Sequence, residues 1–510
     1  MPRERTGWTQ AINGITERRK RSEARRATRC RSALIVPAKR GNSPQGTPRR
    51  EGGRRVTEPV VRNTEDALKS DEEVSTKQQR IAELARIHPD VSFTSLAYYI
   101  DLRWLHEAYL ETRKDGAVGV DNQTATEYQE KLGENLRTLL DRAKSGIYRA
   151  PPVRRVYIPK GTSKTETRPI GIPTFEDKLL QRAVKMVLEP LYEQEFLDCS
   201  YGFRPGRSAH DALQALWKRM MEIGGGWVID LDIRKFFDTV DHTHIREILK
   251  RRVSDGVIQR LIGKWLNAGV WEEGETSYPE KGTPQGGVIS PLLSNIYLHE
   301  VLDKWFKEAV KPRLKGRAHL VRYADDGILM FEREDDARRV MEVLPKRFAK
   351  YGLTIHPEKT RLVKFDWPDK ENLHDHDQQK RSTFNFLGFT HYWGKSRKGS
   401  WIVKRSTEKE RFARALRKIA DWCRRFRHLP VKDQHATLQL KLKGHFAYYG
   451  ITGNFRQLAA FRHKVTLRWW KWLGRRSRDG HLSWEKFLRL LKRYPLAPAR
   501  IVHSVYSANL

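Results

Sequence analysis

Alternation of apolar and polar residues is clearest in two short stretches near the middle of the chain. The stretch Trp227–Ile233 alternates as a β-strand does, with Asp230 and Asp232 on one face. A second stretch, His319–Phe331, is apolar on both sides of Asp325-Asp326-Gly327. An Asp-Gly step between apolar runs predicts a β-hairpin whose turn uses the positive φ of glycine. We therefore expect carboxylates at the tip of a hairpin.

Helical spacing of apolar residues flanks these strands. A 3/4 repeat runs from Leu96 to Tyr109, and Thr174 is placed to cap a helix that continues through Leu188. Residues 335–351 predict an amphipathic helix under the sheet, and helical stretches over residues 411–427 and 438–449 carry Lys and Arg between aromatic residues.

Residues 1–85 are rich in Arg, Gly, Ser and Pro. Too few apolar residues recur there to build a core, which predicts a basic low-complexity arm that is disordered or loosely helical. Two roles stay open for this arm: it helps to hold RNA, or it is a translated leader with little function.

Composition points to a polyanionic partner. The chain has 510 residues, enough for two or three domains, and its formal net charge of +36 favours nucleic acid over an anionic membrane surface. Aromatic residues make up 10% of the chain and offer stacking surfaces beside that charge. No apolar run predicts a membrane span or a signal peptide, and the three cysteines form no CxxC pair. These features argue against a disulfide framework or a cysteine-rich zinc site and fit a reducing cytoplasm.

Three aspartates are candidates for a catalytic metal site. Like charges this close repel, so one carboxylate takes up a proton unless a cation lies between them. Carboxylate oxygens suit Mg²⁺, and polymerases clamp two metal ions ~3.5–4 Å apart for in-line displacement on a phosphate. We predict Asp232, Asp325 and Asp326 as catalytic residues, and these three with Ile233 as ligands of two Mg²⁺ ions. The alternative is a solvated turn that carries two acids.

Five blocks of sequence then follow the order of one polymerase family. They are Tyr157–Lys160 with Arg168–Pro173, Ser200–Ser208, the strand of Asp232, Gly282–Asn295, and the hairpin of Tyr323. Together they resemble a bacterial-type group II intron reverse transcriptase/maturase, over roughly residues 90–500. The C-terminal tail shows none of the His/Cys clusters of the family's HNH endonuclease domain.

The resemblance implies an α+β right-hand polymerase with fingers and palm, followed by an α-helical thumb/maturase domain behind the basic arm. The expected boundaries are residues 1–85 for the arm, 86–395 for fingers and palm with an N-terminal extension over 90–150, and 396–510 for the thumb/maturase domain with a short DNA-binding tail.

The resemblance also implies roles around the incoming nucleotide. Lys160 and Arg168 lie on a fingers hairpin, where a point charge and a fork suit a triphosphate. Phe237 is expected to exclude a 2′-OH, Gln285 to contact the sugar and base, and Lys359 to protonate the leaving pyrophosphate. Ordinary surface or core roles remain the alternatives for Lys160, Arg168, Phe237 and Lys359.

Further positions are expected to hold primer and RNA. Leu387 and Gly388 resemble the primer-grip turn that closes the palm. The predicted RNA-binding residues are Arg204, Arg207, Lys443, Arg475 and Arg476. Arginine planes and aromatic rings stack on unpaired bases, and Lys and Arg hold phosphates.

The predicted function is RNA-directed DNA synthesis with two Mg²⁺ ions and dNTPs, on an RNA template with a DNA primer or target. By resemblance, the protein also binds its group II intron RNA, promotes splicing and supports mobility by target-primed reverse transcription. It is expected in the bacterial cytoplasm, at the nucleoid when bound to target DNA, and not in a membrane. Two alternatives stay open: a splicing maturase with an idle polymerase site, and a retron-like or defence-associated reverse transcriptase.

Overall fold

The computed structural model describes residues 73–159, 167–278, 282, 286–366, 382–396, 398–476 and 482–504. Lys160 and Gln285 lie outside these ranges, as does most of the predicted arm. The end of that arm is an ordered helix, because α3 begins at Val74 and buries Ile81 and Ala85 against the N-terminal helices. The expected boundary at residue 85 is therefore too late.

The N-terminal and fingers part contains helices before and after a strand pair. Its elements are α3 (Val74–Ile87), a 3₁₀ turn (Leu96–Tyr99), α4 (Leu102–Glu111), α5 (Ala125–Glu130), α6 (Leu132–Ser145), β1 (Val153–Pro159), β2 (Thr167–Ile172) and α7 (Phe175–Tyr192). The helix expected over Leu96–Tyr109 is in fact two, because the Asp101 carboxylate caps a new helix through the Trp104 amide at 2.8 Å. The Thr174 cap is confirmed by its contact with the Asp177 amide.

The palm and the rest of the chain follow in order. The central elements are α8 (Ala209–Ile223), β3 (Trp227–Leu231), α9 (Phe236–Thr239), α10 (His242–Lys250), α11 (Gly256–Leu266), β4 (Val270–Glu272), β5 (Glu275–Ser277), α12 (Ser290–Leu298), β6 (Ala318–Tyr323), β7 (Asp326–Phe331), α13 (Glu334–Lys350) and β8 (Arg361–Lys364). Two π-helical stretches (His299–Lys304, Phe306–Val310) and a 3₁₀ turn (Lys311–Arg313) lie between α12 and β6. Then come β9 (Phe384–Phe386), β10 (Phe389–Lys395), β11 (Trp401–Thr407), α14 (Lys409–Arg425), α15 (Val431–Tyr449), α16 (Phe455–Leu473) and α17 (Trp484–Arg493).

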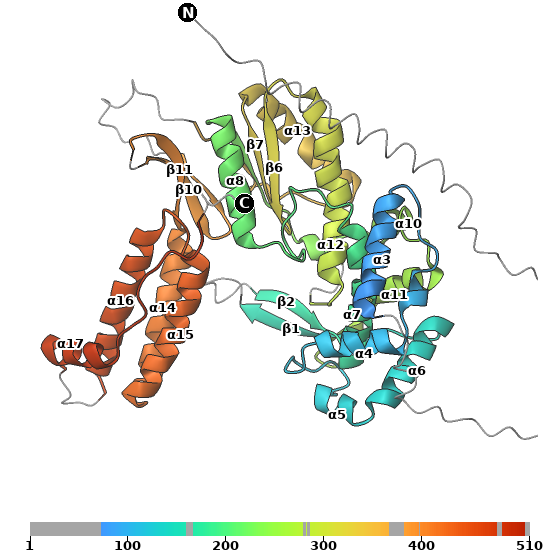
Figure 1. Cartoon of the computed structure of the whole chain (residues 1–510), viewed down its shortest axis with the longest axis horizontal. Coiled ribbons are helices and arrows are strands. Elements are labelled where there is room, and N and C mark those ends of the chain that lie inside the picture. Colours follow the sequence, from blue (N-terminus) through green and yellow to red (C-terminus); the bar gives the residue numbers. More distant parts are fainter. Residues whose placement is uncertain are drawn as a thin grey trace, which may run out of the picture. The chain divides into compact units, whose positions relative to one another are not determined.

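The palm sheet places the acids at one end of adjacent strands. Its order is β6-β7-β3-β8, with β3 antiparallel to both neighbours. One face packs against a core that includes α7, α12 and α13, and the other packs against α8 and the β9–β11 sheet. Figure 1 shows α8 on one side of the β6–β7 hairpin and α12 and α13 on the other. The strand, the hairpin and the helix over residues 335–351 are confirmed as predicted.

The turn of the hairpin lies earlier than predicted. Tyr323 pairs with Asp326, so Ala324 and Asp325 form the turn, and Ala324 rather than glycine adopts the left-handed conformation, with φ of 57°. Gly327 lies inside β7, opposite Arg322 and Leu231. Asp325 therefore occupies the turn and Asp326 begins a strand, which aims the two carboxylates differently.

Two smaller sheets and a helical domain complete the fold. The fingers sheet has the order β2-β1-β4-β5, and the third sheet has the order β11-β10-β9. Helices α14–α17 enclose a separate core that includes Leu438, Phe461 and Trp469. The fold is thus the predicted α+β right hand with an α-helical thumb.

Candidate active site

The sheet register brings the three predicted acids together. Leu231 at the end of β3 pairs with Gly327 near the start of the antiparallel strand β7. Asp232, which follows Leu231, therefore comes opposite Asp326, which precedes Gly327. Asp325 precedes Asp326 in the turn. The electrostatic coupling of Asp326 to both other carboxylates agrees with this placement. The predicted catalytic residues thus form one cluster at the end of the palm sheet.

The cluster is electrostatically costly. Surrounding protein raises the pKa of Asp326 to about 7 by withdrawing solvent, and repulsion from Asp325, Asp232 and Asp230 adds to the rise. The side chain of Asp326 nevertheless keeps an exposed surface, so the site is open to a ligand. Burial also raises the pKa of Asp325, an effect that Arg168 opposes. The fingers residue predicted to meet the triphosphate therefore lies within electrostatic reach of the acids.

Two of the acidic side chains already form ion pairs with basic side chains of the protein. Lys359 Nζ lies 3.3 Å from Asp232 Oδ2, and Arg361 lies 3.0 Å from Asp230 across the β3–β8 pair. Asp325 and Asp326 have no ion-pair partner within the described ranges, which leaves their charge for a cation from solution. In the described part of the chain, no group of three or more His, Cys, Asp or Glu side chains is arranged so that it could hold a metal ion. The oxygen donors nevertheless suit Mg²⁺, which keeps several waters and takes few protein ligands.

The predicted ligand Ile233 has only its backbone to offer a cation. Its side chain is buried, and it forms an isolated antiparallel bridge with Ile355. The carbonyl oxygen is the one group with which Ile233 could hold a cation.

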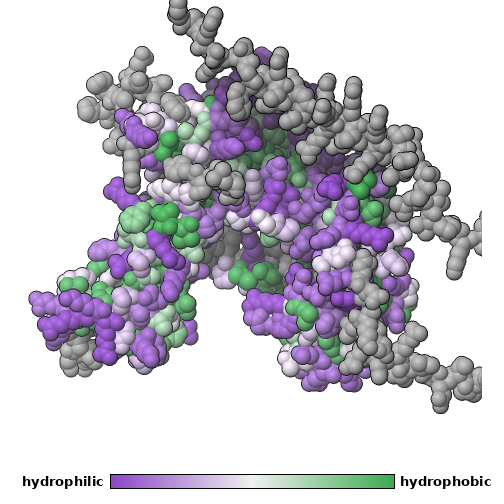
Figure 2. Space-filling view, viewed as in Figure 1, coloured by the Kyte–Doolittle hydropathy of each residue, from purple (hydrophilic) through white to green (hydrophobic). Residues whose placement is uncertain are grey.

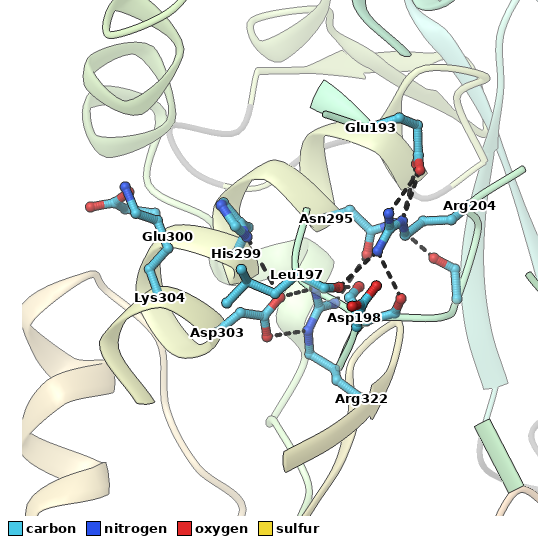
Figure 3. A network of polar contacts seen from close by, with 12 residues as sticks. Glu193, Leu197, Asp198, Arg204, Asn295, His299, Glu300, Asp303, Lys304 and Arg322 are labelled. Carbon is cyan, nitrogen blue, oxygen red and sulfur yellow. Dashed lines mark hydrogen bonds and ion pairs between the residues drawn. The ribbon is translucent and has the colours of Figure 1, made fainter. Parts of the chain in front are cut away.

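A buried arginine fixes the catalytic turn. Arg322 is fully buried, and its guanidinium forms a double ion pair with Asp303 at 2.8 and 2.6 Å (Figure 3). It also donates to Asn295 at 3.0 Å, to the Ala324 carbonyl at 2.8 Å and to the Ser200 hydroxyl at 2.7 Å. All the donors of the fork are thereby engaged, and one of them holds the turn itself.

A neighbouring loop packs closely on the same turn. Gly202 lies so near that a Cβ there would approach the Ala324 amide nitrogen to 2.3 Å. The Tyr201 amide donates to the Arg322 carbonyl at 2.9 Å, and Asn295 donates to the Gly202 carbonyl at 2.7 Å. Only glycine allows this approach. The segment Ser200–Ser208, the second of the five sequence blocks, therefore packs against the turn and helps to fix its position.

The two arginines of that loop pair with carboxylates of this protein. Arg204 is buried, pairs with Glu193 at 2.8 Å and donates to two backbone carbonyls (Figure 3). Arg207 pairs with Asp198 at 2.7 Å and stacks over Tyr201. We withdraw Arg204 from the predicted RNA contacts, because its fork is consumed inside the protein. Arg207 is partly exposed but already paired.

The two phenylalanines after Asp232 differ in burial. Phe236 is buried and Phe237 is half-buried on α9, where Phe237 also packs against the core, so its contact with the sugar stays a prediction. Gly286 lies so close to Gly171 of β2 that a Cβ would meet its carbonyl oxygen at 2.4 Å. The fourth block therefore lies against the fingers hairpin. Figure 2 shows an apolar patch in the region of this hairpin, and Val156 and Ile158 of β1 are exposed.

The predicted primer-grip turn is held by the thumb. Leu387 and Gly388 both have positive φ, 50° and 77°, in a two-residue turn between β9 and β10. The Tyr448 hydroxyl donates to the Leu387 carbonyl at 2.9 Å, and the Glu408 amide donates to the Gly388 carbonyl at 3.0 Å. Sequence reasoning missed Arg411, whose charge opposes the rise in the pKa of Asp326. The sequence feature that could have pointed to Arg411 is the basic start of α14, the helix that follows β10 and β11.

The thumb residues predicted to bind RNA lie away from the acids in sequence. Lys443 is exposed on α15. Arg475 lies over the ring of Trp472, and Arg476 donates to the carbonyls of Arg427 and Leu429. A cavity beside α14 and α16 is lined by Lys464, Arg468, Lys471 and Arg475, among others.

Comparison with known proteins finds a family model and several relatives that match part of the chain. Residues 158–391 match the reverse transcriptase (RNA-dependent DNA polymerase) family. The chain is 34% identical over 302 residues to the group II intron-encoded protein LtrA of Lactococcus lactis subsp. cremoris, covering 56% of this chain and 49% of LtrA. It is 38% identical over 257 residues to protein YkfC of Escherichia coli (strain K12), covering 49% of this chain and 66% of YkfC. Over these stretches the chain is similar to the reverse transcriptase family and to group II intron-encoded proteins.

Other relatives of this family are intron proteins of organelles. Nuclear intron maturase 2, mitochondrial, of Arabidopsis thaliana is 28% identical over 175 residues, covering 27% of this chain and 24% of that protein. The match to LtrA spans about half of LtrA's length. No helix in the described ranges is long and apolar enough to cross a membrane.

Substitution of Arg322 tests its hold on the turn. Arg322→Ala leaves Asp303 buried without its partner and should lower the free energy of unfolding by about 3–5 kcal/mol, measured by denaturant titration. The matched control Arg333→Ala breaks an exposed pair with Asp335 and should cost about 1 kcal/mol or less. Adding Asp303→Ala to Arg322→Ala should recover part of the loss. Equal unfolding midpoints for both single variants would contradict the assignment.

Substitution of Asp326 tests the repulsion within the acid cluster. Because its folded pKa is raised to about 7, the cost of ionising Asp326 is complete above pH 7 and fades as pH falls toward the ordinary carboxyl range. Asp326→Asn should therefore raise the melting temperature in EDTA at pH 8, and the gain should shrink at pH 5. The exposed Asp335→Asn serves as control and should show no such gain. A gain that is larger at pH 5 than at pH 8 would refute the repulsion.

Proposed function

We propose that this protein is an RNA-directed DNA polymerase that also binds group II intron RNA as a maturase. The acid cluster of Asp232, Asp325 and Asp326 carries the proposal. Its pKa shifts record an energetic cost, and a purely structural role gives no reason to bring these carboxylates together. The match to the reverse transcriptase family model and the similarity to LtrA support the same reading.

Two Mg²⁺ ions are the proposed cofactor. Asp232, Asp325, Asp326 and the Ile233 carbonyl would hold them, and when bound they supply Lewis-acid activation of the primer 3′-OH and charge neutralisation at the pyrophosphate. The carboxylate oxygens of Asp325 and Asp326, which have no ion-pair partner in the described ranges, are the kind of ligand that Mg²⁺ prefers.

The chain's own residues position the substrates. Arg168, within electrostatic reach of Asp325, is placed to bind the triphosphate together with Lys160. In this proposal Phe237 meets the sugar of the nucleotide, and Gln285 meets its sugar and base. Lys359, which now pairs with Asp232, is the proposed donor of a proton to the leaving pyrophosphate.

The remaining parts of the proposal concern RNA and mobility. Residues 396–510 form the proposed thumb/maturase domain, with Lys443, Arg475 and Arg476 in contact with intron RNA. We propose that the protein promotes splicing and then uses a DNA target as primer for copying the intron. It would act in the bacterial cytoplasm and at the nucleoid.

Primer extension on an RNA template tests the polymerase. Asp325→Ala should reduce the extension rate by at least about 10³-fold, because a metal-binding carboxylate is lost, while intron-RNA affinity stays within about twofold. The control Asp335→Ala changes an exposed aspartate outside the site and should extend normally. Tight RNA binding by the wild type without extension on any template would favour the idle-polymerase maturase.

Nucleotide selection tests Phe237. Phe237→Ala should raise incorporation of ribonucleotides relative to deoxyribonucleotides by about 10-fold or more, since the bulk that meets the 2′-OH is removed. The measurement is kcat/KM for dNTP and rNTP. The neighbouring Phe236→Leu is the control, and it should change stability but not the ratio, because Phe236 is buried. An unchanged ratio in Phe237→Ala would remove Phe237 from the nucleotide site.

A further inference from the structure

A basic groove lies between α10 and α11, outside the polymerase site. It encloses about 600 Å³ and is lined by Arg149, Arg246, Lys250, Arg260 and Lys264. The rest of its lining is Ala150, Gln259, Gly263 and Asn267, so the groove contains neither a carboxylate nor an aromatic ring. None of these residues belongs to the acid cluster or to the primer-grip turn.

The cations stand in two facing rows. Arg246 and Lys250 are four residues apart on α10, and Arg260 and Lys264 are four apart on α11, so each pair shares one helix face with about 6 Å of rise between its members. A Cβ on Gly263 would come within 3.3 Å of the Arg246 guanidinium. The missing side chain thus lets Arg246 lie over α11 and face the second row.

This charge is left without counter-ions. In the described ranges, no carboxylate forms an ion pair with any of the five cations, although the two residues that follow α10 do have partners. Arg251 pairs with Glu300 and Arg252 pairs with Glu195. Lys264 donates to the Gly146 carbonyl at 2.6 Å and to the Tyr148 carbonyl, which fixes its position without neutralising it. Like charges at helical spacing destabilise the free protein, so an external anion is the missing partner.

We propose that the basic groove binds the phosphodiester backbone of a nucleic-acid strand. Two rows of regularly spaced cations match a ligand with repeated negative charges better than a single anion. Arg149, Lys250 and Arg260 are exposed, so the groove is open to an extended chain rather than closed around a small molecule. Without an aromatic lining the contact is independent of base sequence. The site would hold a strand at a place separate from the one where DNA is made.

Binding of a labelled single strand tests the groove. Arg246→Ala/Lys250→Ala should weaken binding of a 30-nucleotide RNA, or of DNA with the same sequence, by about 10-fold, and should lower the salt slope by about 1.4 for two lost phosphate contacts. The assay contains neither dNTPs nor metal, so its outcome is independent of the polymerase proposal. Loss for RNA alone, for DNA alone or for both identifies the strand and supports the site.

The control variant removes the same charge elsewhere. Arg251→Ala/Arg338→Ala deletes two exposed arginines whose partners are Glu300 and Glu334, and it should leave the affinity within about twofold. Equal weakening in both double variants would overturn the site, because the effect would then reflect net charge alone. Loss of inorganic pyrophosphate binding with strand binding unchanged would also overturn it.

Stability separates a binding role from a structural one. Removing the like-charge pair in Arg246→Ala/Lys250→Ala should raise the melting temperature of the nucleic-acid-free protein, by on the order of 1 °C. The charge-keeping swap Arg246→Lys/Lys250→Arg should retain wild-type affinity. Loss of affinity in that swap, or a fall in melting temperature that accounts for weaker binding, would refute the proposal.

Discussion

The catalytic end of the palm depends on one buried guanidinium. Arg322 has no exposed surface, and burying its charge is tolerable only because Asp303 pairs with it and further oxygens take its remaining donors. Those oxygens come from segments far apart in the chain, including Ser200 and Asn295. The same fork holds the carbonyl of Ala324, so the stability of the core and the placement of the catalytic turn are one constraint. A fixed turn is what allows neighbouring carboxylates to stay close despite repulsion.

The basic residues around the turn differ in how they interact with the rest of the protein. Arg322 is fully committed to protein oxygens, and Arg361 answers Asp230 across neighbouring strands. Arg168 and Arg411 interact with the acids through their charge. Arg168 opposes the rise in the pKa of Asp325, and Arg411 opposes the rise in the pKa of Asp326. Cations that stabilise the sheet are therefore buried or strand-paired, whereas those that remain for substrates come from the fingers and the thumb.

Much of the site could be predicted from sequence because its signals are local. Alternation located the strand of Asp232, and apolar runs located the hairpin. The turn was misplaced because the left-handed residue is Ala324, whose conformation is imposed by Arg322 and by the close approach of Gly202. Arg204 was misread as an RNA contact for a similar reason: its partner Glu193 belongs to the segment after α7, and pairing between distant side chains leaves no periodic trace.

Net charge alone also hides how the positive residues are used. Lys250, Arg251 and Arg252 are adjacent in sequence and equally basic, yet Arg251 and Arg252 are neutralised by glutamates while Lys250 faces the basic groove. A protein that only needed a basic surface would gain stability by pairing all three. Because Lys250 at the end of α10 lines the basic groove while the two arginines after it pair with glutamates, the excess charge is concentrated in the groove. A strand held in the groove and a strand copied at the palm can then occupy different parts of the same protein.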